Sequence, residues 1–197
     1  MCSSDLLSVV QMYDPALDSS SAQTLTLLGD LRRAVEQDEL RLFLQPKVAL
    51  QGHHTLAAEA LVRWQHPQRG LVPPMQFIPF AEQTGFVRQL TLWVFEAAAR
   101  WQAQPQARAL GVRVSVNLST RDLLDPDLSH RLDDILQRHG VAATAFCLEI
   151  TESAIMDDPQ RAEAMLNRLA QQGFRLSIDD FGTGHSSLAY LRRLPVQ

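Results

Sequence analysis

Residues 145–180 read AFCLEITESAIMDDPQRAEAMLNRLAQQGFRLSIDD, and this stretch contains one strand–helix–strand unit. The apolar segments 145–151 and 174–179 are typical of buried strands. Residues 159–172 predict a helix, because Pro159 stands in its first turn and Gly173 follows its end. A helix that connects two consecutive strands of one sheet makes those strands parallel. The fold class therefore follows from this unit: an α/β chain with a parallel sheet.

The same alternation extends toward the N-terminus. Further strands are expected at 40–48, 55–64 and 112–118. Further helices are expected at 24–37, 77–83, 86–104, 127–139 and, after a loop with Gly182 and Gly184, from 187 to 193. Residues 1–22 are polar and carry three consecutive serines, which predicts a linker or the remnant of an upstream domain, with the folded domain at 23–197.

Side chains along the five strands separate into two different faces. One face, at every second position, is small or polar and includes Glu59, Asn117, Glu149 and Asp179. The other face is large and apolar, as in Val114, Val116, Leu148, Ile150 and Ile178. An open sheet covered by helices on both sides would be apolar on both faces. The asymmetry favours a (β/α) barrel, whose inner face is closed off from the helices.

Four strands end in an oxygen-bearing side chain: Glu59, Asn117, Glu149 and the pair Asp179-Asp180. In a barrel, the carboxyl ends of the strands meet at one rim, so these residues would come together. Carboxylate and amide oxygens suit Mg²⁺ or Mn²⁺ rather than zinc, and two adjacent aspartates can serve two ions that act on a phosphate. Each residue alone could equally be a solvated turn residue or a helix cap. The repetition in four units favours a metal site.

The bulk composition excludes several other classes. The net charge of −4, with 20% charged residues, does not fit a protein that binds DNA or RNA polymers through their backbones. Cys2 and Cys147 are too far apart for a disulfide framework or a zinc motif, which favours a reducing cytoplasm. No apolar run reaches the roughly 18 residues of a transmembrane helix.

Six short motifs occur in order and resemble the EAL domain family of cyclic di-GMP phosphodiesterases. They are Leu44-Gln45-Pro46, Glu59-Ala60-Leu61 with Arg63, Phe77-Ile78-Pro79 with Ala81-Glu82-Gln83-Thr84-Gly85, Val116-Asn117-Leu118-Ser119, Glu149-Ile150-Thr151-Glu152 and Asp179-Asp180-Phe181-Gly182. The resemblance covers residues 23–197. It implies a TIM-type (β/α)8 barrel with an antiparallel first strand and hydrolysis of cyclic di-GMP to linear pGpG with two Mg²⁺ or Mn²⁺ ions.

The resemblance also implies roles for individual residues. The metal ligands would be Glu59, Asn117, Glu149, Asp179 and, for the second ion, Asp180. Glu59 and Glu152 would be the catalytic residues. Glu152 would act by bracing the loop 181–187. In the family, this loop also takes part in forming a homodimer. Gln45 and Arg63 would contact the substrate, Arg63 through a phosphate. Residues 12–15 resemble the linker between a GGDEF and an EAL domain, which implies an upstream GGDEF or sensor domain and a cytoplasmic location, alone or within a membrane-anchored parent protein.

The resemblance stops before the family pattern is complete. After Pro195 the family continues with a sixth strand bearing a lysine, a seventh with a glutamate and an eighth with a glutamine. We therefore expect an incomplete barrel of about five strands with little or no turnover by itself. The only lysine, Lys47, lies on the first strand and is not expected to substitute. The alternative function is a non-catalytic module that binds cyclic di-GMP or a protein.

Overall fold

Strands and helices alternate through most of the chain in the computed structural model, which describes residues 15–50, 55–179 and 194–196. The strands are β1 (Leu40–Val48), β2 (Thr55–His66), β3 (Gly70–Val72), β4 (Arg113–Leu118), β5 (Phe146–Thr151) and β6 (Arg175–Asp179). The helices are α1 (Pro15–Glu36), α2 (Ile78–Thr84), α3 (Val87–Gln102), α4 (Pro105–Leu110), α5 (Thr120–Leu123), α6 (Leu128–His139), α7 (Glu152–Met156) and α8 (Pro159–Gln171). The helix expected at 187–193 lies outside the described residues.

The sheet has the order β1-β2-β4-β5-β6, with the short β3 paired to β2. Strands β1 and β3 are antiparallel to β2, whereas the pairs β2–β4, β4–β5 and β5–β6 are parallel. The parallel sheet and the antiparallel first strand are therefore confirmed. The crossover helices α3, α6 and α8 connect the parallel strands, as the alternation of elements requires.

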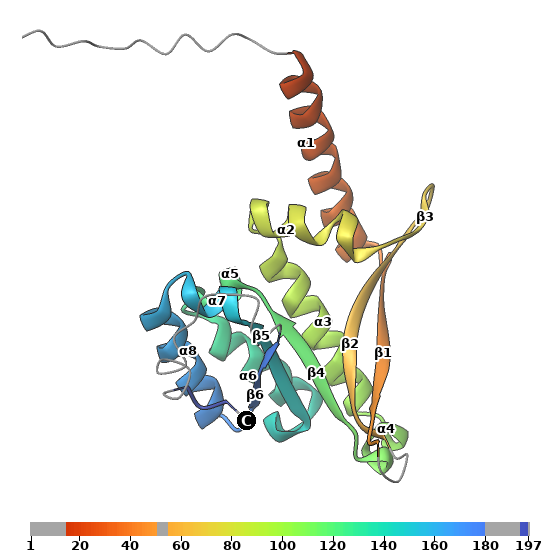
Figure 1. Cartoon of the computed structure of the whole chain (residues 1–197). Helices are drawn as coiled ribbons and strands as arrows, with labels where there is room; N and C mark the ends of the chain where they lie inside the picture. The colour runs from red at the N-terminus through yellow and green to blue at the C-terminus, as the bar shows by residue number, and fades with distance from the viewer. Residues whose placement is uncertain (1–14, 51–54, 180–193, 197) are drawn as a thin grey trace, which may run out of the picture.

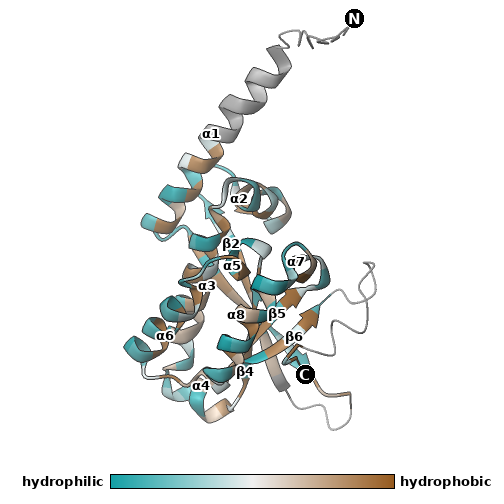
Figure 2. Cartoon of the chain, turned by 90° about the vertical axis from the view of Figure 1, so that its left-hand side faces the viewer, coloured by the Kyte–Doolittle hydropathy of each residue, from teal (hydrophilic) through white to brown (hydrophobic). Residues whose placement is uncertain are grey.

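One face of this sheet is covered by helices and forms the main core. Side chains Val116, Leu148 and Ile150 are at most 1% exposed and pack against residues of α3, α6 and α8. Figure 1 shows these three helices gathered on one side of the strands, and Figure 2 shows their hydrophilic outer surfaces. The predicted division into an apolar outer face and a polar inner face is confirmed. An incomplete TIM-type barrel is consistent with this one-sided layering.

Local sequence signals set the ends of the crossover helices. Gly140 terminates α6 in the left-handed conformation, at φ 59°, which a glycine adopts without steric cost. At α8, Pro159 occupies the first turn and the Asp158 carboxylate accepts a hydrogen bond from the Arg161 amide. The strands β5 and β6 consequently begin at defined positions, which fixes the register of the residues at their ends.

A second, smaller core attaches α1 to the sheet. Leu31 and Ala34 of α1 are fully buried against a group that includes Trp64 and Phe77. The Trp64 indole donates a hydrogen bond to Glu39 at 3.0 Å. Helix α1 starts at Pro15, nine residues before the helix start that was expected at residue 24. Proline is favoured in a first helical turn, and no second proline interrupts the segment that follows.

The strands β2 and β4 diverge toward their carboxyl ends. They pair only from Ala57–Arg113 to Glu59–Ser115, after which β2 continues beside β1 and β3 while β4 continues beside β5. The resulting split lies over the N-terminal half of α3. It opens next to Glu59, where the first of the predicted site residues is placed.

Candidate active site

Glu59, Asn117 and Glu149 lie beside one another on the inner face of the sheet. Asn117 is in register with Glu149 on β5, and Glu59 is in register with Ser115, two residues before Asn117 on β4. The Asn117 amide donates a hydrogen bond to Glu59 Oε1 at 3.0 Å across the split between β2 and β4. The strand ends thus bring together three of the five predicted metal ligands.

The metal ligands that this site offers are oxygen atoms, because the nearby Cys147 thiol is protonated. Glu149 is 8% exposed, and Cys147 lies two residues before it on the same face. Burial raises the pKa of the Cys147 thiol, and the Glu149 carboxylate raises it further. The thiol therefore remains protonated near neutral pH and is a poor metal ligand. The oxygens of Glu59, Asn117 and Glu149 are a set that suits a hard divalent cation.

Lys47 reaches this set from β1, which sequence reasoning did not foresee. Its ammonium forms an ion pair with Glu149, lies 3.8 Å from Glu59 Oε2 and donates to Ser115 Oγ at 3.3 Å. Burial lowers the pKa of Lys47, but the hydrogen bond and charge of Glu149, with the charge of Glu59, outweigh this and raise the pKa. A positive group held between the two carboxylates shows that this place binds cationic charge.

Asp179 lies farther along the rim. It is in register with Thr151, whereas Glu149 is in register with Ser177, so Asp179 extends two positions beyond Glu149. Asp180 lies outside the described residues. Within the described part of the chain, no three acidic, histidine or cysteine side chains come close enough to share an ion. The oxygen donors Glu59, Asn117 and Glu149 suit a divalent ion by their chemistry, and the Lys47 ammonium supplies the positive charge beside the two acids.

The two predicted substrate residues flank the set on β1 and β2. Gln45 is exposed and lies directly opposite Glu59 in the antiparallel register. The guanidinium carbon of Arg63 lies 5.8 Å from the centre of the Phe43 ring, and Arg63 Nη1 donates to the Val62 carbonyl at 2.9 Å. Phe43 is half exposed on the same inner face, so its ring contacts one side of the guanidinium and leaves the other side open.

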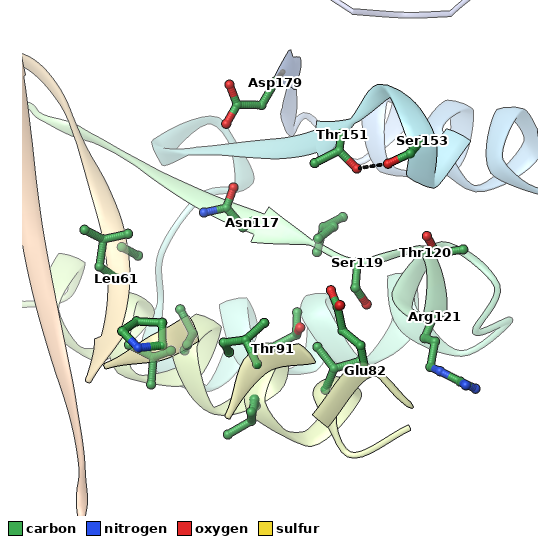
Figure 3. Close-up of a pocket in the computed structure, with 18 of the residues that line it drawn as sticks. Leu61, Glu82, Thr91, Asn117, Ser119, Thr120, Arg121, Thr151, Ser153 and Asp179 are labelled. Atoms are coloured by element: carbon green, nitrogen blue, oxygen red, sulfur yellow. Dashed lines mark hydrogen bonds between the residues drawn. The ribbon is translucent and has the colours of Figure 1, made fainter. Parts of the chain in front are cut away.

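A cavity of about 790 Å³ occupies the split between β2 and β4. Apolar residues of α3, among them Leu90 and Val94, line it together with Arg63, Asn117 and Asp179. Figure 3 shows Asn117 and Asp179 on the side of the strands and Glu82, from α2, on the opposite side. The volume and the mixed lining are those of a small-molecule site.

The segments that follow β4 and β5 each contain a buried carboxylate, Asp122 and Glu152. Asp122 Oδ2 accepts hydrogen bonds from the Ser119 amide at 2.8 Å and from the Thr91 hydroxyl at 3.0 Å, which joins the loop after Asn117 to α3. Burial raises the pKa of Asp122, and these hydrogen bonds offset part of the shift. Glu152, 3% exposed, begins α7 directly after β5. The loop 181–187 that it was expected to brace lies outside the described residues.

A family model of the EAL domain matches residues 28–197. The chain belongs to the EAL domain family. The bifunctional diguanylate cyclase/cyclic di-GMP phosphodiesterase MucR of Pseudomonas aeruginosa is 39% identical over 187 residues, which are 93% of this chain and 27% of MucR. The cyclic di-GMP phosphodiesterase PdeR of Escherichia coli is 36% identical over 185 residues, 94% of this chain and 28% of PdeR. The EAL chain therefore spans less than a third of the length of these relatives.

Solved EAL structures share the fold. The MucR phosphodiesterase in complex with c-di-GMP superposes with a TM-score of 0.81 at 41% identity, over 87% of this chain and 70% of that one. The FimX EAL domain superposes with a TM-score of 0.79 at 27% identity, over 87% and 69%. Among the described helices of this EAL domain, none has the length and apolar character needed to cross a membrane.

Proposed function

We propose that this EAL domain binds cyclic di-GMP and hydrolyses it to linear pGpG with the help of Mg²⁺ or Mn²⁺. The observation that carries the proposal is the convergence of Glu59, Asn117 and Glu149 beside a cavity that Asn117 and Asp179 line. Oxygen donors placed beside a pocket of nucleotide size are the arrangement that metal-assisted phosphodiester hydrolysis needs.

Each residue has a defined task in this proposal. Glu59, Asn117, Glu149 and Asp179, with Asp180 for a second ion, would hold the metal. When bound, the metal supplies a polarised phosphate and an activated water. The Asn117 amide orients the Glu59 carboxylate through their hydrogen bond to Oε1 at 3.0 Å, while the second oxygen, Oε2, faces the Lys47 ammonium at 3.8 Å.

The substrate would be oriented by residues on the first two strands. Arg63 lines the cavity, and its guanidinium presents several donors to a phosphate. Gln45, opposite Glu59, would contact the nucleotide from the other side of the carboxylate. Glu152 would hold the loop after β6 in position, because it is buried at the start of α7 beside the same rim.

The similar proteins support this reading and extend it to the whole protein. MucR and PdeR are named as cyclic di-GMP phosphodiesterases, and a MucR structure contains c-di-GMP. Their greater length supports a parent protein with an upstream GGDEF or sensor domain. We further propose a homodimer of the complete domain and a cytoplasmic location.

The test is an assay of purified chain with Mn²⁺ and cyclic di-GMP, in which pGpG is measured by chromatography and substrate binding by calorimetry. We expect slow, Mn²⁺-dependent formation of pGpG that Glu59→Gln reduces by roughly 100-fold or more. Glu163→Gln on the outer helix α8 is the matched control and should behave like the wild type.

The second candidate is a module that binds cyclic di-GMP without cleaving it. One observation favours it: the side chain paired with Glu149 is the ammonium of Lys47. Binding of cyclic di-GMP with no pGpG above the Glu59→Gln background would establish this candidate for the 197-residue chain. Formation of pGpG that stops in Glu59→Gln would exclude it.

A further inference from the structure

Lys47 connects β1 with β5 across the inner face of the sheet. On this face, β2 and β4 lie between the two strands, so a flat sheet would separate β1 from β5 by three strand spacings, or about 14 Å. The ion pair between Lys47 and Glu149 therefore requires a strongly curved sheet with a concave inner face. Lys47 is directly opposite Ala57, whose small side chain leaves room for the lysine to extend over β2.

The ammonium is placed against both carboxylates that flank Asn117. It pairs with Glu149 and lies 3.8 Å from Glu59 Oε2, while Glu59 Oε1 receives the amide of Asn117. These are oxygens that the proposed function assigns to a divalent cation. The ammonium and a divalent cation cannot occupy the same oxygens, and their like charges repel.

We propose that Lys47 is a tethered counter-ion of the Glu59–Glu149 pair, which competes with the divalent cation and sets the affinity of the metal site. This inference rests on the proposed metal site and adds a residue that tunes it. Lys47 neutralises the two carboxylates when no divalent ion is bound, and its side chain leaves Glu149 when the ion arrives. The long, flexible stem of lysine suits a group that has to move.

The substitution Lys47→Met tests the competition, because methionine keeps an unbranched apolar stem without the charge. Mn²⁺ titrated into the full chain by isothermal calorimetry should bind about tenfold more tightly to K47M than to the wild type. The factor is modest because the Lys47 side chain is 41% exposed and partly screened by solvent. K47R keeps the charge and should remain within about threefold of the wild type.

A matched control removes a charge from the same strand outside the site. Arg41 lies at the other end of β1 and is bound to the backbone carbonyls of Asp38 and Leu40, so R41M should leave the Mn²⁺ affinity unchanged. Thermal unfolding gives an independent readout. In EDTA, K47M should melt below the wild type because the two acids lose their cation, and added Mn²⁺ should raise its melting temperature more than that of the wild type.

Equal Mn²⁺ affinity of the wild type and K47M, or weaker binding by K47M, would overturn the counter-ion proposal and leave the metal site in place. A change of the same size in R41M would also overturn it, since the effect would then follow from net charge alone. Absence of Mn²⁺ binding in the wild type and in K47M alike would overturn the metal site of the proposed function.

Discussion

Asn117 on β4 is bound to the Glu59 carboxylate across the split between β2 and β4. Its amide nitrogen is 3.0 Å from Glu59 Oε1, so this position requires a hydrogen-bond donor as long as no cation lies between the two groups. The Asn117 side chain is exposed to the cavity, and among the described residues no hydrogen bond to its oxygen is found. The residue therefore serves both the stability of the rim and the proposed metal site.

The substitution Asn117→Asp replaces this donor with a third negative charge. We expect N117D to lower the melting temperature in EDTA, because two carboxylates would stand about 3 Å apart. Saturating Mn²⁺ should restore most of the loss. Asn167→Asp on α8 makes the same chemical change away from the site and should show no such recovery. Equal responses of the two variants to Mn²⁺ would contradict the assigned position of the metal.

Asp122 predicts a dependence of stability on pH. Since burial raises its pKa in the folded chain, the folded state binds the proton more tightly than the unfolded state. The stability from this group is complete below the unfolded pKa, about 4, and is lost as the pH rises through the folded pKa. The free energy of unfolding of Asp122→Asn, measured in urea, should therefore rise relative to that of the wild type as the pH increases above about 4. A difference that is constant over this range would contradict the shift.

At the scale of elements, α1 is held by a small core that is separate from the main one. Leu31 is fully buried in it, beside Trp64 and Phe77. Truncation of Leu31 to alanine should cost about 2–5 kcal/mol of unfolding free energy, measured in urea. Leu110→Ala on α4 removes the same atoms from a side chain that is 66% exposed and should cost far less. Equal losses in the two variants would contradict the docking of α1.

The helices and strands that are long enough to show a repeating pattern of apolar residues could be predicted from the sequence. Helix α8 and strand β6 were expected at 159–172 and 174–179 and are found at Pro159–Gln171 and Arg175–Asp179. The short elements β3, α4, α5 and α7 were not expected, because three to six residues do not span enough turns or alternations to show a pattern. Helix α5 is instead stabilised by the capping box of Ser119 and Asp122.

At the scale of the whole molecule, the curvature of the sheet decides which predicted residues meet. Period-2 alternation along the strands predicted that Glu59, Asn117 and Glu149 share one face. Alternation also places Lys47 on the face of Gln45, two residues away. The contact between Lys47 and Glu149 depends on how far the sheet bends between β1 and β5, which no local pattern encodes. The expected position of Asp179 at the rim is found, while its role as a ligand stays a prediction.

The most direct test is the location of Mn²⁺ in crystals of the full chain, measured from the anomalous scattering of manganese. We predict a peak bonded to the oxygens of Glu59, Asn117 and Glu149, with the Lys47 ammonium displaced from Glu149. Manganese bound only elsewhere, or no peak among these three residues at saturating Mn²⁺, would contradict the assignment of this rim as the metal site.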